Sequence, residues 1–563
     1  MSGEMLGSLY NQNGYSTARM RNIWSDKNRI KVICQVEVAV AYAMAKNGKI
    51  PEKAYQEIQA KLVPENINPT QLKIESARAG HFLAGFVTVA QPLFDDDSGQ
   101  YVHYGAASED VEDTAFVLQL KESDRVLKAY LNQLGKILYQ LCEKYQRTPT
   151  AAIAHKTYAA PTTLGFKLGI ILNELDYLMR RLDSLGSFTF AGSLAGADGT
   201  SSMLGADYQQ VEADFCAHLG LSKPEMYWHT QRERFTEYCH VETMIAQALG
   251  RLGKNLLYMS QTIVGEFQEA YAPGRQGSTV VPTVCNPYMV EAIVNLATVI
   301  KNEMGLMYDT MTVDGEKDTT VWRDLYVALP EMTMYLSGQL NYAINILKFG
   351  QFNPQRMRQN LSADDGTMYS GSLMMALAKF MGRENAHGLL VKLRDKADHQ
   401  QVTLRDLFYA DATIAKYLSK AELDRVMTPN DHLDNAISKT EQILKLYKAR
   451  HFNVTMERKI NMAQKIDDSK YLWQAPVSDT HTRIGLNDLA RSEIGEISFA
   501  AFPKNLSEVV EGDVILSFEG AKAITEVHSP KAGKVAKINT DLLDHPEYLD
   551  DADHDKDWIV ELY

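Results

Sequence analysis

Three separated segments of the chain combine side chains that could transfer protons or hold a small anion. They are HYGAASEDVEDTA (103–115), AHKTYAAPTTLG (154–165) and GRQGSTVVPTVCNP (274–287). The imidazole of His155 can donate or relay a proton near neutral pH. The hydroxyl of Ser278 could remove one only if its alkoxide were stabilised, as backbone N–H groups of a glycine loop could do. Taken singly, each segment predicts only a loop serine or a structural histidine.

The elements that must position these segments are long helices. Apolar residues recur at spacings of three and four, which is the pattern of one buried face of a helix in a bundle. The two clearest stripes are Ile245, Leu249, Leu252, Leu256, Met259 and Ile263, and Ile293, Leu296, Ile300, Met304 and Met307. A single helix cannot bury such a stripe alone, so the pattern also favours association of several chains.

The sequence changes character after about residue 470. Short runs rich in β-branched and aromatic residues are separated by glycine and proline, which predicts strands and turns. The predicted strands cover 497–502, 513–518 and 534–538. We therefore expect a compact β domain at the C-terminus.

Composition sets the limits. A chain of 563 residues is too long to fold around a single hydrophobic core, so several domains are expected. The net charge of −13 disfavours a nucleic-acid partner. The five scattered cysteines include no CxxC pair, which is typical of a reducing, cytoplasmic protein. The N-terminus lacks the pattern of a signal peptide, and no run of about 20 uncharged apolar residues predicts a membrane span. The expected ligands are small molecules.

Together and in this order, the three segments resemble the signature regions of the fumarase/aspartase superfamily. The resemblance extends from about Met20 to Leu446, through RNIWSDKNR (21–29) and MMALAKFMGRENAH (374–387). It implies a mainly α fold with a long-helix bundle, a lyase body that needs no cofactor, and a homotetramer whose sites are assembled from several subunits.

Two branches of that superfamily compete. WHTQRER (228–234) and QTIVGEFQEAYAPGRQGS (261–278) resemble 3-carboxy-cis,cis-muconate cycloisomerase, whereas His81 resembles the second histidine of adenylosuccinate lyase. Thr17 and Tyr326 stand where adenylosuccinate lyase has phosphate-binding arginines, and a nucleotide would lose those charge partners. We therefore expect a cycloisomerase-like lyase acting on a small acid, with the exact substrate left open.

The resemblance also implies roles for single residues. Family members remove a proton next to a carboxylate and then expel the β-substituent, or run the reverse addition. Ser278 is then the general base and His155 supplies or relays the other proton, while His81 is either a catalytic acid or a packing residue. The expected substrate-binding residues are Ser108, Gln231, Arg232, Thr279 and Asn286.

Three positions depart from the family pattern. Ala107 and Ala154 replace threonines, and Val284 replaces the loop lysine that neutralises the substrate carboxylate. Loss of one preorganised donor typically costs about 10²–10³ in rate. Two interpretations stay open: a lyase whose substrate differs, or a carrier and scaffold protein whose lyase body has lost its activity.

The C-terminal residues 483–503 and 511–549 resemble the H protein of glycine cleavage, a lipoyl carrier. Lys522, within Glu519–Ala523, matches the lysine that bears lipoate, which implies a covalent lipoate and a lipoate-attaching enzyme as partner. The alternative is an ordinary solvated lysine. The acidic stretch 550–557 predicts a charged surface rather than a metal site, because it lacks fixed ligand spacing.

These expectations divide the chain into five parts. They are an N-terminal helical domain (1–110), a central long-helix bundle with the catalytic loop (111–355), a C-terminal helical domain of the lyase body (356–450), a connector (451–478) and an H-protein-like lipoyl-type domain (479–563).

Overall fold

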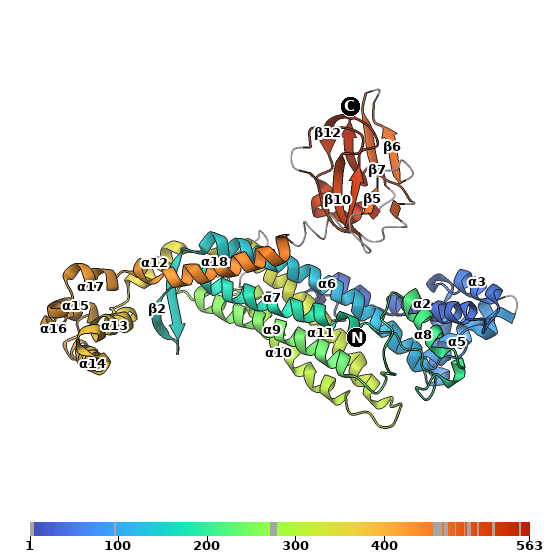
Figure 1. The fold of residues 1–563 in the computed structure, drawn as a ribbon, viewed down its shortest axis with the longest axis horizontal. Coiled ribbons are helices and arrows are strands. Elements are labelled where there is room, and N and C mark those ends of the chain that lie inside the picture. Colours follow the sequence, from blue (N-terminus) through green and yellow to red (C-terminus); the bar gives the residue numbers. More distant parts are fainter. Residues whose placement is uncertain are drawn as a thin grey trace. The chain divides into compact units, whose positions relative to one another are not determined.

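The chain folds into two compact units, Met1–Leu444 and Lys445–Tyr563, each with its own apolar core (Figure 1). The structure is a computed structural model. It describes residues 5–94, 97–270, 278–453, 464–466, 471–478, 480–488, 490–491, 497–503, 506–520, 524–550 and 553–563.

Five long helices form the centre of the first unit and run side by side (Figure 1). They are α6 (Ser108–Tyr145), α7 (Leu164–Thr189), α9 (Glu233–Ser260), α10 (Tyr288–Asp309) and α11 (Thr320–Phe349). Both predicted stripes lie on these helices, and their members are buried with one exception. The exception is Ile263, which lies beyond the end of α9 and is 79% exposed. The expectation that Ile263 belongs to the core was therefore wrong, because the helix ends before it.

Shorter helices pack at the two ends of this bundle. At one end lie α1 (Ala18–Ile23), α2 (Asp26–Lys46), α3 (Glu52–Lys61), α4 (Pro69–Ala79), α5 (Phe82–Ala90) and α8 (Tyr208–His218). At the other end lie α12 (Pro354–Ser362), α13 (Ser370–Met381), α14 (Arg383–Gln400), α15 (Leu404–Ala410), α16 (Ala412–Tyr417) and α17 (Lys420–Val426), followed by α18 (Asp434–Lys448). Figure 1 shows α2, α5 and α8 far from α13 and α14. The long helices therefore separate two ends of the unit.

Small strand pairs connect these helices. An antiparallel hairpin, β1 (Pro149–Ala154) and β2 (Thr157–Thr163), joins α6 to α7. The second pair, β3 (Phe267–Gln268) and β4 (Gln351–Phe352), ties the chain after α9 to the chain after α11. Among the described residues, no helix has the length and apolar character that a bilayer crossing requires.

The second unit is a β domain built from two sheets. One has the strand order β5 (Gln464–Ile466), β11 (Ile524–His528), β10 (Val514–Gly520) and β8 (Ile497–Ala501). The other has the order β6 (Leu472–Pro476), β7 (Thr482–Leu486), β13 (Trp558–Leu562), β12 (Gly533–Ile538) and β9 (Glu508–Val509), and a short helix, α21 (Asp541–Asp544), follows β12. The three predicted strands correspond to β8, β10 and β12. Strands β5 and β6 begin before residue 479, so the sheets also use part of the stretch expected to be a connector.

Candidate functional site

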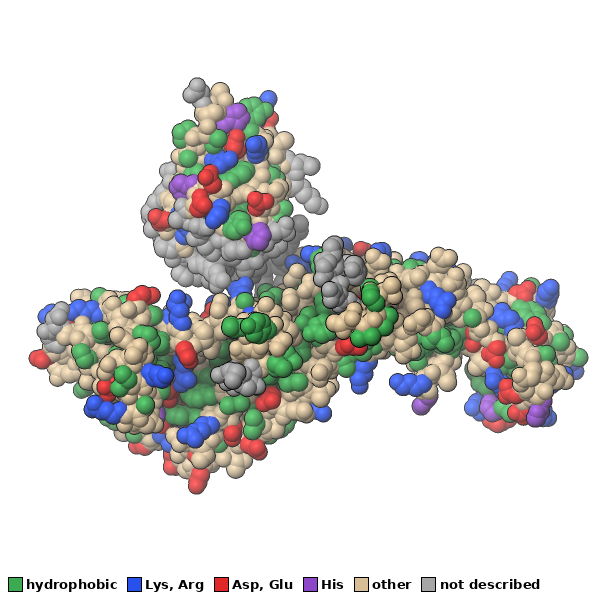
Figure 2. Space-filling model, turned by 180° about the vertical axis from the view of Figure 1, so that it is seen from behind, with side chains coloured by type: hydrophobic (Ala, Val, Ile, Leu, Met, Phe, Trp, Pro, Cys, Tyr) green, Lys and Arg blue, Asp and Glu red, His purple; other side chains and the backbone are tan. Residues whose placement is uncertain are grey.

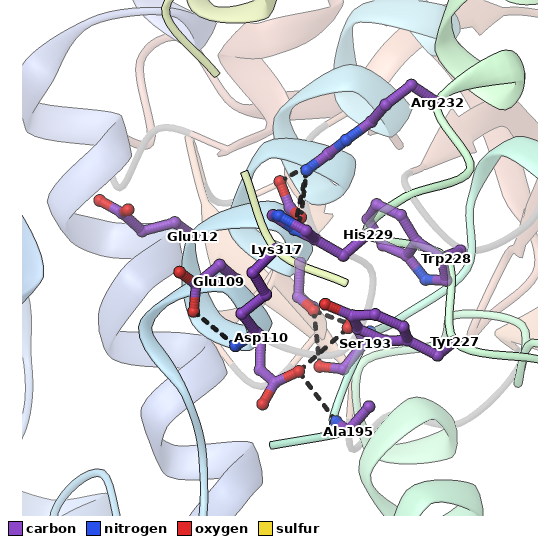
Figure 3. A network of polar contacts seen from close by, with 12 residues as sticks. Glu109, Asp110, Glu112, Ser193, Ala195, Tyr227, Trp228, His229, Arg232 and Lys317 are labelled. Carbon is purple, nitrogen blue, oxygen red and sulfur yellow. Dashed lines mark hydrogen bonds and ion pairs between the residues drawn. The ribbon is translucent and has the colours of Figure 1, made fainter. Parts of the chain in front are cut away.

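The first signature segment forms the start of α6, and a buried carboxylate fixes its geometry (Figure 3). Asp110 accepts hydrogen bonds from the backbone N–H groups of Ala107 (2.9 Å), Ala195 (2.8 Å) and Gly196 (2.9 Å), and from the Ser193 hydroxyl (3.1 Å). Burial raises the pKa of Asp110, and the backbone hydrogen bonds partly offset that rise. Ser108, the first residue of α6, is half-buried beside this anchor.

One turn further along α6, Glu112 faces one of the predicted histidines. His81 precedes α5, and its Nδ1 accepts the Ala84 N–H at 3.4 Å. Its Nε2 lies 3.8 Å from Oε2 of Glu112, whose other oxygen accepts a hydrogen bond from Arg29 at 3.3 Å. Burial raises the pKa of Glu112 to about 7, although the charge of Arg29 opposes the rise. His81 therefore faces a carboxyl group whose pKa is raised to about 7.

The next residue, Asp113, is the centre of a second buried network. The guanidinium of Arg232 donates to both of its carboxylate oxygens at 3.0 Å, and Nδ1 of His229 lies 3.0 Å from Oδ2. Burial alone would raise the pKa of Asp113, but the charge of Arg232 and the hydrogen bonds from both partners lower it below its usual value. Arg232 is 1% exposed and is already paired with Asp113. A substrate-binding arginine was expected to be free to contact a ligand, and within one chain Arg232 is not. Gln231 beside it is exposed.

The aromatic ring of Trp322 lies near the histidines of both networks. The Trp322 ring centroid lies 6.4 Å from that of His81 and 5.7 Å from that of His229. Tyr326 stacks on Trp322 and is half-buried, and Thr17 caps α1. Thr17 therefore caps a helix, and Tyr326 packs against an aromatic ring.

The second signature segment forms the tip of the β1–β2 hairpin. His155 and Lys156 occupy its two-residue turn, both with left-handed backbones (φ 49° and 69°) as in a type I′ turn. Side chains other than glycine seldom adopt this conformation. His155 is exposed within one chain, so any partner for its ring must come from outside this hairpin.

The third signature segment precedes α10. The hydroxyl oxygen of Ser278 accepts the N–H groups of Val280 (3.2 Å) and Val281 (3.0 Å), so it sits in a turn rich in backbone donors. Residues 271–277, including Gly277, lie outside the described residues. The carboxylate of Glu269 accepts the N–H groups of Met289 (3.2 Å) and Val290 (3.0 Å), which joins the chain before this loop to the start of α10. Thr279, Val284 and Asn286 are exposed on the loop.

A single chain does not bring the three segments together. Helix α6 has 38 residues and separates Ser108 from the β1–β2 hairpin by about 57 Å. Helix α10 has 22 residues and spans about 33 Å, with Ser278 before its start and its last turn bonded to Thr236 near Arg232. His81 and Ser108 therefore lie at one end of the bundle, whereas His155 and Ser278 lie beyond the far ends of α6 and α10.

Glu112, Asp113 and His229 were missed as site residues by the sequence analysis. The acidic pair could be mistaken for a solvated helix face, because its partners lie far away in the sequence. The available signal was the position of both carboxylates within the first signature segment, on a helix whose neighbouring positions are apolar. Among the described residues, no three histidine, cysteine or acidic side chains are grouped as metal ligands would be.

The raised pKa of Glu112 predicts how stability depends on pH. Because the folded chain binds this proton more tightly than the unfolded chain, the stabilisation is complete below about pH 4.5 and is lost as the pH rises to about 7. A Glu112→Gln variant lacks this titrating group. As the pH rises from about 4.5 to about 7, the free energy of unfolding measured in urea should therefore fall in wild type, relative to the variant, by up to about 3 kcal/mol. Glu384→Gln, at an exposed position, should track wild type at every pH. Parallel curves for Glu112→Gln and wild type would contradict the prediction.

In the second unit, the predicted carrier lysine falls just outside what can be described. Lys522 belongs to residues 521–523, which are not described. The strands on either side, β10 and β11, pair antiparallel with Glu519 opposite Ile524. The lysine is therefore flanked by the two arms of an antiparallel pair.

Comparisons with known proteins cover both units. Residues 12–301 match the family described as Lyase, residues 366–443 match the family described as adenylosuccinate lyase C-terminus, and residues 465–563 match the family described as glycine cleavage H-protein.

Curated relatives align along nearly their whole length. N-acetyl-S-(2-succino)cysteine lyase of Dickeya dadantii is 30% identical over 79% of this chain and 98% of its own. The 3-carboxy-cis,cis-muconate cycloisomerase of Pseudomonas aeruginosa is 32% identical over 78% of this chain and 96% of its own. The crystal structure of the 3-carboxy-cis,cis-muconate lactonizing enzyme from Pseudomonas putida superposes with a TM-score of 0.72 at 29% identity, over 78% of this chain and 98% of that one. These matches favour an enzyme over a scaffold that has lost its activity.

Proposed function

Because the chain belongs to the fumarase/aspartase superfamily of lyases, we propose that its helical body removes a proton next to a carboxylate or carbonyl of a small organic acid and then eliminates the β-substituent, or performs the reverse addition. In this proposal Ser278 is the base and His155 donates or relays the other proton. The substrate is held by Ser108, Thr279, Asn286 and Gln231, and His81 is a second acid that faces Glu112.

The geometry supports this division of roles. The hydroxyl oxygen of Ser278 already accepts two backbone N–H groups, and such donors stabilise the alkoxide that a serine base must form. The side chain of His81 is 36% exposed, and its Nε2 points toward Glu112. The imidazole can therefore contact a ligand and transfer a proton to that ligand.

The observation that carries the proposal is that the signature segments occupy separate ends of the long helices. Residues that must act on one small molecule cannot remain this far apart, so copies of the chain must combine their ends. Members of the superfamily are usually homotetramers that act on small-molecule acids. Large apolar side chains also remain exposed on the long helices, as the space-filling view shows for one face (Figure 2). They include Ile170, Tyr177, Tyr288, Tyr308 and Val327.

We therefore expect a homotetramer in solution. Long helices that expose this much apolar surface gain free energy by packing against other copies. Light scattering coupled to size exclusion should give about four times the chain mass at micromolar concentration. A stable monomer at that concentration would show that the segments are not joined in this way.

The function itself is tested with candidate acids. Purified protein is incubated with N-acetyl-S-(2-succino)cysteine, 3-carboxy-cis,cis-muconate and adenylosuccinate, the acids named by the matched relatives and families. The positions of Thr17 and Tyr326 predict no turnover of adenylosuccinate. Turnover of either of the other two by elimination or cyclisation supports the proposal. If the tetrameric protein turns over none of the three, the substrate class proposed here is wrong.

For the second unit we propose a covalent lipoate on Lys522. The support is the match of residues 465–563 to the glycine cleavage H-protein family and the antiparallel strands that flank this lysine. Intact-mass measurement of protein from its native host should show the mass of one lipoyl group per chain, and Lys522→Arg should remove it. The neighbouring Lys531→Arg serves as the matched control and should keep the added mass. An unmodified chain from a host that lipoylates its other carriers would reject the proposal.

A further inference from the structure

The start of α6 carries two histidine–carboxylate–arginine networks rather than one. Glu112 pairs with Arg29 and faces His81, while the adjacent Asp113 pairs with Arg232 and His229. The two imidazole rings lie near the same Trp322 ring. Only the first network contains a histidine that the proposed function uses, so the second has no role yet.

The ring of His229 is held on one edge only. Its Nδ1 lies 3.0 Å from Asp113 Oδ2 and 2.9 Å from a guanidinium nitrogen of Arg232. Its Nε2 is buried and has no hydrogen-bond partner among the described residues, although His229 is only 1% exposed. A buried polar atom left without a partner costs about 1–3 kcal/mol, so such atoms are usually satisfied by a group that binds there.

The contact of Nδ1 with Arg232 fits a ring that carries its proton on Nε2. When Nδ1 accepts from Arg232, the single ring proton lies on Nε2. When the neutral ring instead donates from Nδ1 to Asp113, Nε2 carries a lone pair and can only accept. The guanidinium of Arg232 can only donate, so its 2.9 Å contact with Nδ1 fits the first tautomer, which directs an N–H group from Nε2 away from this network.

The surroundings of His229 belong to the site at the start of α6. Tyr227 stacks on the ring with centroids 6.0 Å apart, and its hydroxyl donates to the Glu316 carbonyl at 3.1 Å. Lys317 reaches past the ring to Glu109 at 2.8 Å, which Figure 3 shows. Glu109 directly follows Ser108, a proposed substrate-binding residue, and Asp113, the partner of His229, lies on the same helix. Ala107 on the other side of Ser108 has no polar side chain to offer a ligand.

We propose that His229 is a further catalytic residue, donating a hydrogen bond from Nε2–H to a carboxylate or carbonyl oxygen of the small acid. This inference rests on the proposed function and adds a substrate contact to it. The chemistry matches, because an acid presents an oxygen that needs a donor. A donor held in place by a buried ion pair needs little reorganisation when negative charge develops on that oxygen.

The test uses two substitutions that remove different atoms. His229→Asn keeps an amide near Nδ1 and deletes Nε2, whereas His229→Gln can place an amide N–H near Nε2. His240→Asn is the matched control, because His240 is exposed on α9 and contacts Tyr308. All variants are first compared by thermal unfolding and light scattering, so that folding and assembly are known to be intact.

Two measurements then decide. With whichever acid the wild type turns over, His229→Asn should lose about 10²-fold or more in kcat/KM, His229→Gln should recover part of it, and His240→Asn should match wild type. With succinate as a dicarboxylate probe, the ligand-induced rise in Tm should be lost in His229→Asn and kept in His240→Asn.

The failures of the two proposals can be told apart. If His229→Asn folds and keeps both turnover and the succinate effect, Nε2 meets only a water molecule and the inference is wrong, while the lyase function stands. If no candidate acid is turned over but succinate stabilises the wild type and not His229→Asn, the substrate contact stands and the proposed reaction does not. If both variants at position 229 unfold, succinate must still raise the Tm of wild type; its failure to do so overturns the contact.

Discussion

Replacing Ser278 by alanine is expected to reduce turnover by at least about 10³-fold while the affinity for substrate changes little. The serine oxygen is the proposed base, and alanine has no atom that can take the proton. Because the backbone donors of Val280 and Val281 act on a charge that exists only while the proton is being removed, the loss falls on kcat rather than on KM. Steady-state kinetics with an acid that the wild type accepts will measure it.

A matched serine separates a chemical role from a structural one. Ser260 at the end of α9 also has a hydroxyl engaged with backbone, since it donates to the Leu256 carbonyl at 2.7 Å. Ser260→Ala should therefore stay within a few-fold of wild type. A Ser278→Ala enzyme that retains more than about a tenth of the activity would remove Ser278 from the mechanism.

The second large effect is on stability. Asp113→Ala is expected to lower the free energy of unfolding by about 3–5 kcal/mol, because it leaves the charge of Arg232 buried without its carboxylate. Arg232 and Asp113 are each 1% exposed, so water cannot replace the lost partner at low cost. Urea unfolding followed by circular dichroism at fixed protein concentration gives the difference.

An exposed ion pair provides the contrast. Asp398 pairs with Arg394 at 3.1 Å on α14, with side chains 60% and 46% exposed. Removing such a pair typically changes stability by 0–1 kcal/mol, so Asp398→Ala should be nearly neutral. Equal losses in the two variants would mean that burial of the Asp113–Arg232 pair contributes little.

Periodicity predicted the long helices well, because a stripe of apolar residues has few ways to be buried. Every member of the α9 and α10 stripes is in the core except Ile263, where the pattern continued past the end of the helix. Alternation and glycine spacing likewise predicted β8, β10 and β12. The shortest strands, β5 with three residues and β9 with two, were not predicted, because so short a run gives too little pattern to recognise.

The candidate site was predicted in part. The sequence proposed Ser108, His81 and Ser278, but it could not show that Arg232 is buried against Asp113, 119 positions away in the chain. The charge of Arg232, in the segment 228–234, was therefore interpreted as a ligand contact, whereas the fold pairs it with Asp113. His229 was not predicted for the same reason. What distinguishes it is a buried Nε2 without a hydrogen-bond partner among the described residues, which only the packed structure reveals.

The length of α6 has a genetic consequence. If each active site combines the ends of different chains, one chain supplies Ser108 to one site and His155 to another. A substitution in one chain then inactivates only the sites that receive the altered residue. Chains damaged at Ser108 and chains damaged at His155 would each be inactive alone. In mixed assemblies, some pockets would receive both intact residues, and two inactive alleles could restore activity to each other.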